Sequence, residues 1–569
     1  MATMTSKTTS ATFLLGLLLA LALPARTSQA IDIAVPADAP TIGEAIALAS
    51  SGDRILVAPG TYAERIDYSG KDLVIESTGG AAVTVIDGGG EPGHVVVFAS
   101  GESRAAVLRG FTVTGGFGSG GSDGVGAGGG VLVDGASPLI EDCVIADNDG
   151  IYGAGLQSVD GDVLVRGTRF VDNMGIQGGG IAAEGGRLVV ENCEFEANFA
   201  GYGGAIAVLW NAEAELRTSQ FTGNSAHQFG GAIYATHAQL RATWLTVVDN
   251  GEATPTDDGV GQVFSTFGGG GIYTTGTSGR IELSRFVANT AFAGGGLYIA
   301  GDGEMELVNL LVARSNTALG GVYSNTSSPL IASCTIVDSG TFALFTTYNA
   351  APTVANSILA GGGNIGGNGL TQLDYSLVDG SVTATSVGEG NVFGEALLDA
   401  AADYVPLAGS PVIDAGDNAR VPADVTVDLL GNDRFFDDPG TPDGGNGQAP
   451  IVDMGAIEFG SSLPGDSDVT AARDVPGAGL ATVTVAPNPF NPRTELRLAL
   501  DRAADVRVAV YDARGRLVER IDAGRLDAGR HAIAWDGTDR DGRALSAGVY
   551  LAIVRAGAQE RMVKMSLVR

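Results

Sequence analysis

Four tyrosines occupy the same position in a recurring phrase of the sequence. Each directly follows the apolar residue that comes after a run of glycines, and the four are Tyr234, Tyr273, Tyr298 and Tyr323. Successive side chains of a strand point to opposite faces, so an inward apolar residue places the next tyrosine outward. We expect the four rings to be exposed and nearly collinear, and exposed tyrosines stack on sugar rings. They are therefore glycan-binding candidates, and mutual stacking that stabilises a sheet is the alternative.

A second group of residues could bind a metal ion. Aspartates crowd into one loop, Asp433, Asp437, Asp438 and Asp443, and into one hairpin, Asp536, Asp539 and Asp541. Hard cations prefer carboxylate oxygens, so calcium is the one cofactor that these clusters suggest. Aspartate is also a common turn former, which is the alternative explanation for both clusters. The four histidines, His94, His227, His237 and His531, share no metal-ligand spacing.

The net charge narrows the choice of partners. The chain has 569 residues, and 65 acidic residues against 33 lysines and arginines give a formal charge of −32. Such a chain repels phosphate backbones, so we expect no nucleic-acid partner. Cations, and neutral or basic glycans, suit this charge better.

The phrases that contain the tyrosines belong to an internal repeat. FVDNMGIQGGGIAA begins at Phe170, FEANFAGYGGAIAV at Phe195, FTGNSAHQFGGAIY at Phe221 and FVANTAFAGGGLYI at Phe286. A fixed period of about 20 to 50 residues indicates a solenoid or a propeller. The period here is close to 25 residues, which suits three short strands and three turns better than a four-stranded propeller blade. The repeat therefore predicts that each unit is one coil of a parallel β-helix.

Aligning the units defines three columns of residues. The first is Cys143, Thr168, Cys193, Ser219, Leu245, Ser284, Asn309, Cys334 and Asn356. Two positions later comes an inward apolar residue, at Ile145, Phe170, Phe195, Phe221, Val247, Phe286, Leu311, Ile336 and Ile358. An asparagine follows at Asn148, Asn173, Asn198, Asn224, Asn250, Asn289 and Asn316. We expect stacked phenylalanines, asparagines bonded from coil to coil, and three buried cysteines too far apart to pair. About eleven coils would make a rod on the order of 50 Å long.

Changes in composition divide the chain into five segments. Residues 1–30 have the apolar run and small cleavage residues of a signal peptide, and no later run is long enough for a transmembrane segment. Residues 31–403 form the β-helix, with 31–51 as its N-terminal cap, where Thr41 and Glu44 predict a helix capping box. Residues 404–460 close the far end, 461–479 are a linker, and 480–569 are a small β-sandwich. An insertion at 251–266 should form a loop beside the tyrosine face.

Three parts of the sequence resemble known families. The repeat over about 40–400, with GGGI, GGAI and F-x-x-N, resembles the right-handed β-helix of pectate-lyase-like proteins and of polymorphic outer membrane proteins. SPVIDAGDN, DLLGNDR and DMGAIEF resemble a segment that closes β-helices in bacterial surface proteins. APNPFNP (486–492), WDGTDRDG (535–542), AGVYLAIV (547–554) and Lys564 resemble the C-terminal sorting domain of type IX secretion and the Ig-like domain of flagellar hook-capping proteins. The resemblance implies an all-β protein: a right-handed parallel β-helix solenoid, then a small Ig-like β-sandwich that directs export and surface attachment.

The resemblance leaves catalysis open because one fold hosts many functions. The GHG triplet with paired aspartates of polygalacturonases is absent, as are the esterase signatures. A lyase needs a calcium site and a basic residue, and Lys71 is the only lysine within the coils. Arg166, Arg217 and Arg241 recur singly, as expected of surface residues. No catalytic residue is therefore assigned, and the balance leans away from an enzyme.

These observations favour an exported, non-catalytic scaffold at the surface or outer membrane of a bacterium. The expected partners are an extracellular polysaccharide or a cell-surface glycan, and the secretion and anchoring machinery through residues 480–569. Two alternatives stay open, a secreted polysaccharide lyase or glycoside hydrolase and a structural envelope protein.

Overall fold

The computed structural model describes two compact units, Met1–Asp466 and Ser467–Arg569. The described residues are 30–118, 129–251, 266–362, 364–382 and 385–461 in the first unit. In the second they are 482–486, 490, 493–500, 504–512, 517–527, 529–538, 543, 545, 548–556 and 559–567. The predicted signal peptide up to 29, the linker at 462–479 and most of the predicted loop at 251–266 lie outside these ranges.

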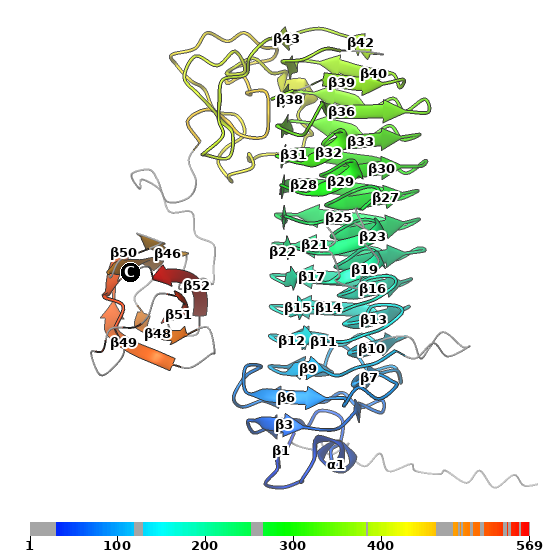
Figure 1. The fold of residues 1–569 in the computed structure, drawn as a ribbon, viewed down its shortest axis with the longest axis vertical. Helices are drawn as coiled ribbons and strands as arrows, with labels where there is room; N and C mark the ends of the chain where they lie inside the picture. Colours follow the sequence, from blue (N-terminus) through cyan, green and yellow to red (C-terminus); the bar gives the residue numbers. More distant parts are fainter. Residues whose placement is uncertain are drawn as a thin grey trace, which may run out of the picture. The chain divides into compact units, whose positions relative to one another are not determined.

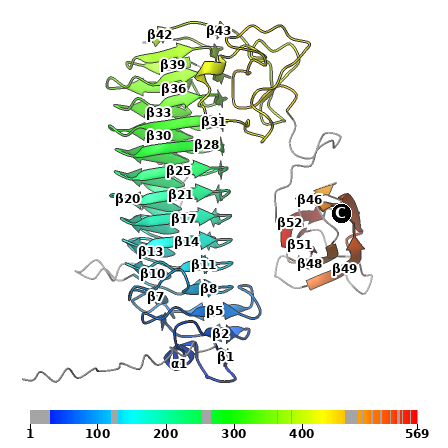
Figure 2. The same ribbon diagram turned by 180° about the vertical axis from the view of Figure 1, so that it is seen from behind.

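The first unit is a right-handed parallel β-helix of about twelve coils (Figures 1 and 2). Each coil contributes a strand to a 12-stranded sheet, which we call sheet B. Its strands are β4 (Ile66–Asp67), β7 (Val96–Phe98), β10 (Val131–Asp134), β13 (Leu156–Val159), β16 (Ile181–Glu184), β20 (Ile206–Leu209), β24 (Ile233–Thr236), β27 (Ile272–Thr275), β30 (Leu297–Ala300), β33 (Val322–Asn325), β36 (Phe342–Thr347) and β39 (Asn364–Gly367).

The other strands of each coil form a 27-stranded sheet, which we call sheet A. Its first row is β1 (Asp32–Val35), β2 (Arg54–Val57), β5 (Val74–Ser77), β8 (Val107–Arg109), β11 (Leu139–Glu141), β14 (Asp162–Arg166), β17 (Arg187–Glu191), β21 (Glu213–Arg217), β25 (Gln239–Thr243), β28 (Ser278–Val287), β31 (Met305–Ala313), β34 (Leu330–Ala332), β37 (Thr353–Ala355), β40 (Thr371–Asp374) and β42 (Thr385–Val387). Its second row is β3 (Gly60–Tyr62), β6 (Thr84–Asp87), β9 (Thr112–Thr114), β12 (Val144–Ala146), β15 (Arg169–Val171), β18 (Glu194–Glu196), β22 (Gln220–Thr222), β26 (Thr246–Val248), β35 (Thr335–Val337), β38 (Ile358–Ala360), β41 (Leu377–Val378) and β43 (Val392–Phe393). The long strands β28 and β31 belong to both rows.

The repeated phenylalanines lie inside the helix, as the sequence predicts. Phe170, Phe195 and Phe221 pair in register between neighbouring coils, and all three are buried. Their ring centroids are 4.8 Å apart and their planes lie within 4° of parallel. The spacing equals the distance between strands in a sheet, so each coil places its ring directly on the next.

The asparagines of the repeat bond to one another, which is also predicted. Six buried asparagines, Asn148, Asn173, Asn198, Asn224, Asn250 and Asn289, form this ladder. Each of the first five donates its side-chain N–H to the amide oxygen of the next at 2.9–3.0 Å. The same oxygen accepts the backbone N–H of the preceding asparagine. The ladder thus satisfies buried polar groups at one corner of successive coils.

The predicted register is wrong by one residue on two coils beyond Ser284, whereas Cys334 and Ile336 hold their predicted positions. Ser284 pairs with Leu310 and Phe286 with Val312, so the step is 26 residues, and Asn309 and Leu311 do not hold the predicted positions. Asn316 pairs with Thr290 and is exposed, so it does not continue the asparagine ladder. In the same way, Leu359 is inward and Ile358 faces out, while Ser357 takes the position predicted for Asn356.

The closing segment explains why the repeat alignment placed the apolar residues Leu311 and Ile358 in the inward column. It contains the short hairpin β44 (Leu398–Asp399) and β45 (Val405–Pro406) and the 3₁₀ turn η1 (Asn418–Arg420). Leu311 and Ile358 pack into a second core with Leu429, Met454 and Ile457 of this segment. The segment, yellow in Figures 1 and 2, therefore lies against the outer face of sheet A over the last coils, rather than over the end.

Two of the misassigned asparagines hold the closing segment in place. Asn309 donates its side-chain N–H to the carbonyl of Val427 at 2.8 Å. Asn356 donates to the carbonyl of Asp417 at 2.9 Å, and its amide oxygen accepts the backbone N–H of the same residue at 2.8 Å. These side chains point outward and dock the segment instead of lining the corner of a coil.

One short helix, α1 (Ile42–Leu48), follows β1 at the N-terminal end. Thr41 caps it by accepting the backbone N–H of Glu44 at 3.1 Å, as the sequence predicts. Glu64, from a later part of the first coils, accepts the N–H groups of Ile42 and Gly43. The N–H groups of Ile42, Gly43 and Glu44, which have no partner within the helix, are therefore bonded to side chains. The apolar face of the helix packs on the first coil.

The three cysteines are free and buried, as predicted. They are Cys143, Cys193 and Cys334. Burial raises the pKa of each thiol to about 12. They are therefore protonated core residues with little reactivity at neutral pH.

The second unit is a sandwich of two antiparallel sheets. One sheet contains β46 (Thr482–Ala486), β47 (Thr494–Leu500) and β50 (Gly529–Trp535). The other contains β49 (Leu517–Leu526), β48 (Ala504–Asp512), β51 (Gly548–Ala556) and β52 (Gln559–Leu567). Trp535 lies in its core between Phe490 and Tyr550, each with its ring centroid 5.5 Å away.

Candidate functional site

The predicted tyrosines form part of a continuous aromatic column on the outer face of sheet B. Strand pairing places Tyr234, Tyr273, Tyr298, Tyr323 and Phe345 directly opposite one another on successive strands. Consecutive ring centroids are 5.5, 4.8, 4.5 and 5.8 Å apart. We call these five residues the aromatic column.

The column is less exposed than the sequence predicts. Tyr323 is buried, with 7% of its surface exposed, and Tyr234, Tyr273 and Tyr298 are half-buried. Burial raises the pKa of Tyr273 and Tyr298, so their hydroxyls stay protonated. The ring faces point along the rod toward neighbouring rings. The hydroxyl of Tyr298 accepts the side-chain N–H of Asn325 at 2.9 Å, and the hydroxyl of Tyr323 bonds to that of Thr347 at 2.9 Å. Most of the stacking surface is therefore used inside the column.

Residues from the preceding corner of each coil cover one flank of the column. Tyr202, at the end of β19 (Phe199–Tyr202), lies 5.2 Å from the ring of Tyr234. Phe229, at the end of β23 (Ser225–Phe229), lies 4.5 Å from Tyr273. The next residue in this row is Gly268, where a Cβ atom would come within 2.6 Å of the following tyrosine ring. The covering row explains why the tyrosines are only half-exposed.

Three exposed aromatic rings lie beside the column, and the sequence analysis did not identify them. Phe267 is 61% exposed and Phe292, in β29 (Thr290–Ala293), is 56% exposed on the next coil. Tyr348, 68% exposed, directly follows β36 and therefore lies at the other edge of sheet B from Phe267 and Phe292, which precede their strands. They stand outside the glycine–apolar–tyrosine phrase, so no repeat position marked them. We call these three residues the exposed rings.

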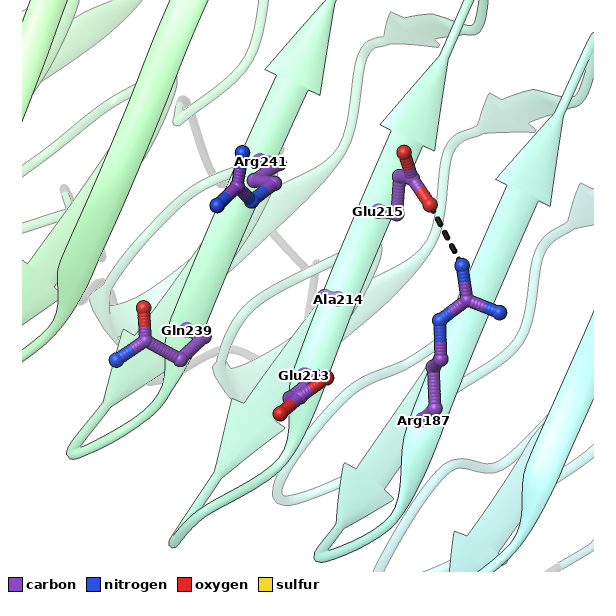
Figure 3. A pocket seen from close by; sticks show the side chains of 6 residues that line it. All are labelled: Arg187, Glu213, Ala214, Glu215, Gln239 and Arg241. Atoms are coloured by element: carbon purple, nitrogen blue, oxygen red, sulfur yellow. Dashed lines mark hydrogen bonds and ion pairs between the residues drawn. The ribbon is translucent and has the colours of Figure 1, made fainter.

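A polar groove lies on the outer face of sheet A, on neighbouring strands β17, β21 and β25 (Figure 3). Its volume is about 580 Å³ and Arg187, Glu213, Glu215, Gln239 and Arg241 point into it, with the small Ala214 at its base. Arg187 pairs with Glu215 at 2.8 Å. Arg241 has no acidic partner within ion-pair distance in the described part of the chain. The groove thus offers one unpaired guanidinium and the carboxylate of Glu213 to solvent.

Two of the arginines that the sequence analysis took as single surface residues, Arg166 and Arg217, belong to an ion-pair ladder on sheet A. One column alternates strictly in charge along six coils, and its members are Glu76, Arg109, Glu141, Arg166, Glu191 and Arg217. Every consecutive pair is an ion pair, with N–O distances of 2.9, 2.7, 3.6, 3.1 and 2.8 Å. Such partly exposed pairs contribute little individually, so we assign this ladder a structural role.

Polar side chains of the closing segment form a buried network. Arg434 pairs with Glu458 at 3.1 Å, and both side chains are fully buried. The guanidinium also donates to the carbonyls of Asp453 and Gly455 at 2.9 and 2.8 Å. The carboxylate of Asp453 accepts two backbone N–H groups, from Asp414 and Phe459. These polar groups therefore fix the loops of the closing segment together.

The structure changes the membership of the predicted metal cluster. Carboxylate oxygens of Asp414, Asp437 and Asp443 lie within 4.8 Å of one another. Asp433 is outside this group. Asp438 is outside it as well and caps a turn, accepting the hydroxyl of Thr441 at 2.7 Å. Asp414 lies in the phrase SPVIDAGDN, well before the predicted loop, so spacing in the sequence did not place it there.

The second predicted aspartate cluster is only partly described. Asp539 and Asp541 lie outside the described residues. Asp536 accepts the hydroxyl of Thr538 at 2.6 Å, which is the contact of a turn-forming aspartate.

Comparison with protein families supports both units. Residues 71–251 match the family described as a right handed beta helix region, and residues 490–560 match the FlgD Ig-like domain. These matches agree with the expected β-helix and with the expected Ig-like domain near the C-terminus. A search of curated proteins found no match to the chain.

Solved structures resemble parts of the chain only weakly. Dimeric latent PorU from Porphyromonas gingivalis is 24% identical over 15% of this chain and 9% of its own, with a TM-score of 0.14. FlgD from P. aeruginosa is 22% identical over 16% of this chain and 73% of its own, with a TM-score of 0.12. The A-module of the mannuronan C-5 epimerase AlgE4 from Azotobacter vinelandii is 12% identical over 62% of this chain and 91% of its own, with a TM-score of 0.20. At these identities and scores the similarities support no inference about activity.

Among the described residues, no helix has both the length and the apolar character needed to cross a bilayer.

Proposed function

We propose that the protein is an exported, non-catalytic β-helix scaffold that contacts a polysaccharide along the outer face of sheet B. The observation that carries the proposal is the set of exposed rings, Phe267, Phe292 and Tyr348, beside the aromatic column. Isolated exposed apolar residues are ordinary on a protein surface, but exposed rings on both sides of one aromatic column favour a binding surface. Sugar rings stack on aromatic faces, and these three rings have more free surface than the column itself.

The coil spacing suits an extended sugar chain. Neighbouring coils are about 4.8 Å apart, which is close to the length of one sugar residue. Phe267 and Phe292 lie on adjacent coils, since the backbone N–H of Ala293 donates to the carbonyl of Phe267 at 3.0 Å. A polysaccharide that runs parallel to the rod would meet these rings at successive residues. The edges and hydroxyls of the column would then provide polar contacts beside it.

The test compares binding and stability in matched variants. The triple variant Phe267→Ala, Phe292→Ala, Tyr348→Ala removes exposed rings only, so we expect its melting temperature to stay within a few degrees of wild type. Its binding to an array of extracellular polysaccharides should fall. Phe393→Ala is the control, because Phe393 is similarly exposed, at 57%, but lies on the last coil of sheet A. Equal loss of binding in the control and the triple variant would refute a specific surface.

We propose further that the C-terminal Ig-like domain directs export and attachment at the cell surface. Its match to the FlgD Ig-like domain and its separation as a compact unit support a role apart from the β-helix. Type IX sorting is the specific form of this proposal, which rests on the sequence phrases. Expressing the chain with and without residues 480–569 in its native bacterium tests it. The truncated protein should fold but be lost from the cell surface, and normal surface display would contradict the proposal.

A polysaccharide lyase or hydrolase is the second candidate, and the groove of sheet A is the observation that favours it. Glu213 and Glu215 lie two residues apart on one face of β21, and paired carboxylates are the usual groups of glycoside hydrolysis. Arg241 would bind an acidic sugar there. A screen on polygalacturonate, alginate and neutral polysaccharides would follow new double bonds and reducing ends. Turnover that is abolished in Glu213→Gln or Glu215→Gln would replace the scaffold proposal with this one.

A further inference from the structure

The closing segment buries more acidic side chains than basic ones. Asp414, Asp417, Asp428, Asp453 and Glu458 are buried in it, and Arg434 is the only buried arginine or lysine among the described residues. Asp417 pairs with the partly exposed Arg420 at 3.5 Å. Arg434 forms its ion pair with Glu458. Burying an unpaired charge is costly, so the remaining carboxyls need hydrogen bonds, protons or a cation.

Two of the remaining carboxyls are satisfied by backbone groups. Asp428 accepts the N–H groups of Leu430 and Asn432 at 2.9 Å and that of Glu458 at 3.2 Å. Asp453 accepts two backbone N–H groups, as described above. Hydrogen bonds of this kind stabilise a carboxylate in the protein interior. The unexplained group is therefore Asp414.

Asp414 is fully buried, and both of its carboxylate oxygens lack a hydrogen-bond partner among the described residues. Burial raises its pKa to about 7, and the charge of Asp453 adds to this shift. The backbone N–H of Asp438 offsets part of the shift without meeting hydrogen-bond geometry. A buried polar atom without a partner in a native fold calls for a proton or a ligand at that place.

The side chain of Asp414 faces two exposed carboxylates rather than a donor. Oxygens of Asp437 and Asp443 lie within 4.8 Å of its own, so three negative groups converge on one point. Without a cation these groups repel one another. With a cation between them, the same spacing places three oxygen ligands around one ion.

We propose that Asp414, Asp437 and Asp443 bind a Ca²⁺ ion that fastens the 437–443 loop to the closing segment. Calcium takes six to eight oxygen ligands in flexible geometry, so three carboxylates and waters suffice, whereas Mg²⁺ requires a strict octahedron. One buried and two exposed ligands make a partly open site, of the kind that extracellular modules use at high calcium concentration. The site is independent of the polysaccharide surface on sheet B.

The test measures calcium binding by isothermal titration of the full chain after chelator treatment. Wild type should bind Ca²⁺, and the double variant Asp437→Asn, Asp443→Asn should bind at least about tenfold more weakly. Both substituted residues are exposed, so the variant should fold. Asp433→Asn is the control, because it removes one negative charge from the same segment but lies outside the three-carboxylate group. It should bind like wild type.

Thermal melting gives a second, independent measurement. Calcium that binds only the folded state should raise the melting temperature of wild type and of Asp433→Asn, and raise that of the double variant less. No heat and no melting shift for wild type in about 10 mM Ca²⁺, well above the affinities of extracellular sites, would overturn the proposal. So would equal binding by the double variant, or equal responses to Mg²⁺ and Ca²⁺, which would indicate a general effect of an acidic surface.

Discussion

The asparagine ladder permits a stability prediction whose size can be worked out from its hydrogen bonds. In the middle of the ladder, the side-chain N–H groups of Asn198 donate to Asn224 at 3.0 Å and to the carbonyls of Phe170 and Glu196 at 2.8 and 3.2 Å. Its amide oxygen accepts two N–H groups of Asn173, at 2.9 and 3.2 Å. Asn198→Ala therefore removes five hydrogen bonds at a buried corner.

The cost depends on which partners lose their only bond. The backbone N–H of Asn173 would be left buried without a partner, at about 1–3 kcal/mol. The carbonyl of Phe170 stays within the strand pairing between β15 and β18. The side chain of Asn173 keeps a bond to the carbonyl of Ile145, and the amide oxygen of Asn224 keeps the backbone N–H of residue 198. Adding about 1 kcal/mol for the other lost bonds, we expect Asn198→Ala to lower the free energy of unfolding by about 2–4 kcal/mol.

The control comes from the corrected register. Asn316 occurs in an equivalent-looking phrase, but it is exposed and outside the ladder. Asn316→Ala should change the free energy of unfolding by less than about 0.5 kcal/mol. Urea unfolding, followed by far-ultraviolet circular dichroism, measures both variants. Similar losses for the two would refute the reasoning, because they would place Asn316 in the ladder or show that the ladder contributes little.

Three other predictions concern the core, the thiols and the acidic cluster. Phe195→Ala removes a ring stacked on both sides, so it should cost about 3–5 kcal/mol in urea unfolding, and a cost below about 1 kcal/mol would contradict the stack. Cys143, Cys193 and Cys334 should not react with a thiol reagent at pH 8 in the native protein, and all three should react after denaturation without reductant; a count of one would reveal a disulfide. The folded state holds the proton of Asp414 more tightly than the unfolded chain, since burial raises its pKa to about 7. Its contribution to stability is therefore lost as the pH rises from about 4 to about 7 in chelator, and melting curves of Asp414→Asn should lack this component of the pH dependence.

Much of the fold follows from the sequence because the repeat reports a physical constraint at every coil. Phe195 and Asn198 can be assigned from spacing alone, since each position stacks on the same residue type above and below. The assignment fails at Leu311 and Ile358, where an outward residue is apolar. Those side chains are buried by the closing segment, about 100 residues later, and a repeat pattern contains no information on that contact.

The candidate sites also depend on contacts between distant segments, which the sequence pattern does not predict. Strand pairing aligned Tyr234 and Tyr273, but the cover supplied by Tyr202 and Phe229 depends on the path of each corner, which varies between coils. Asp414 lies more than 20 residues before the loop that it faces, so a search for neighbouring aspartates could not include it. Function at these places depends on contacts between segments, and the sequence specifies the segments better than their contacts.

The most direct test of the central proposal is the affinity of the exposed rings for a polysaccharide. A polysaccharide that binds wild type on the array would be titrated against the triple variant Phe267→Ala, Phe292→Ala, Tyr348→Ala. At about 1 kcal/mol for each stacked ring, the dissociation constant should rise by about 100-fold while the melting temperature stays within a few degrees. An unchanged dissociation constant would contradict the account, and would show that the outer face of sheet B is not the surface that binds.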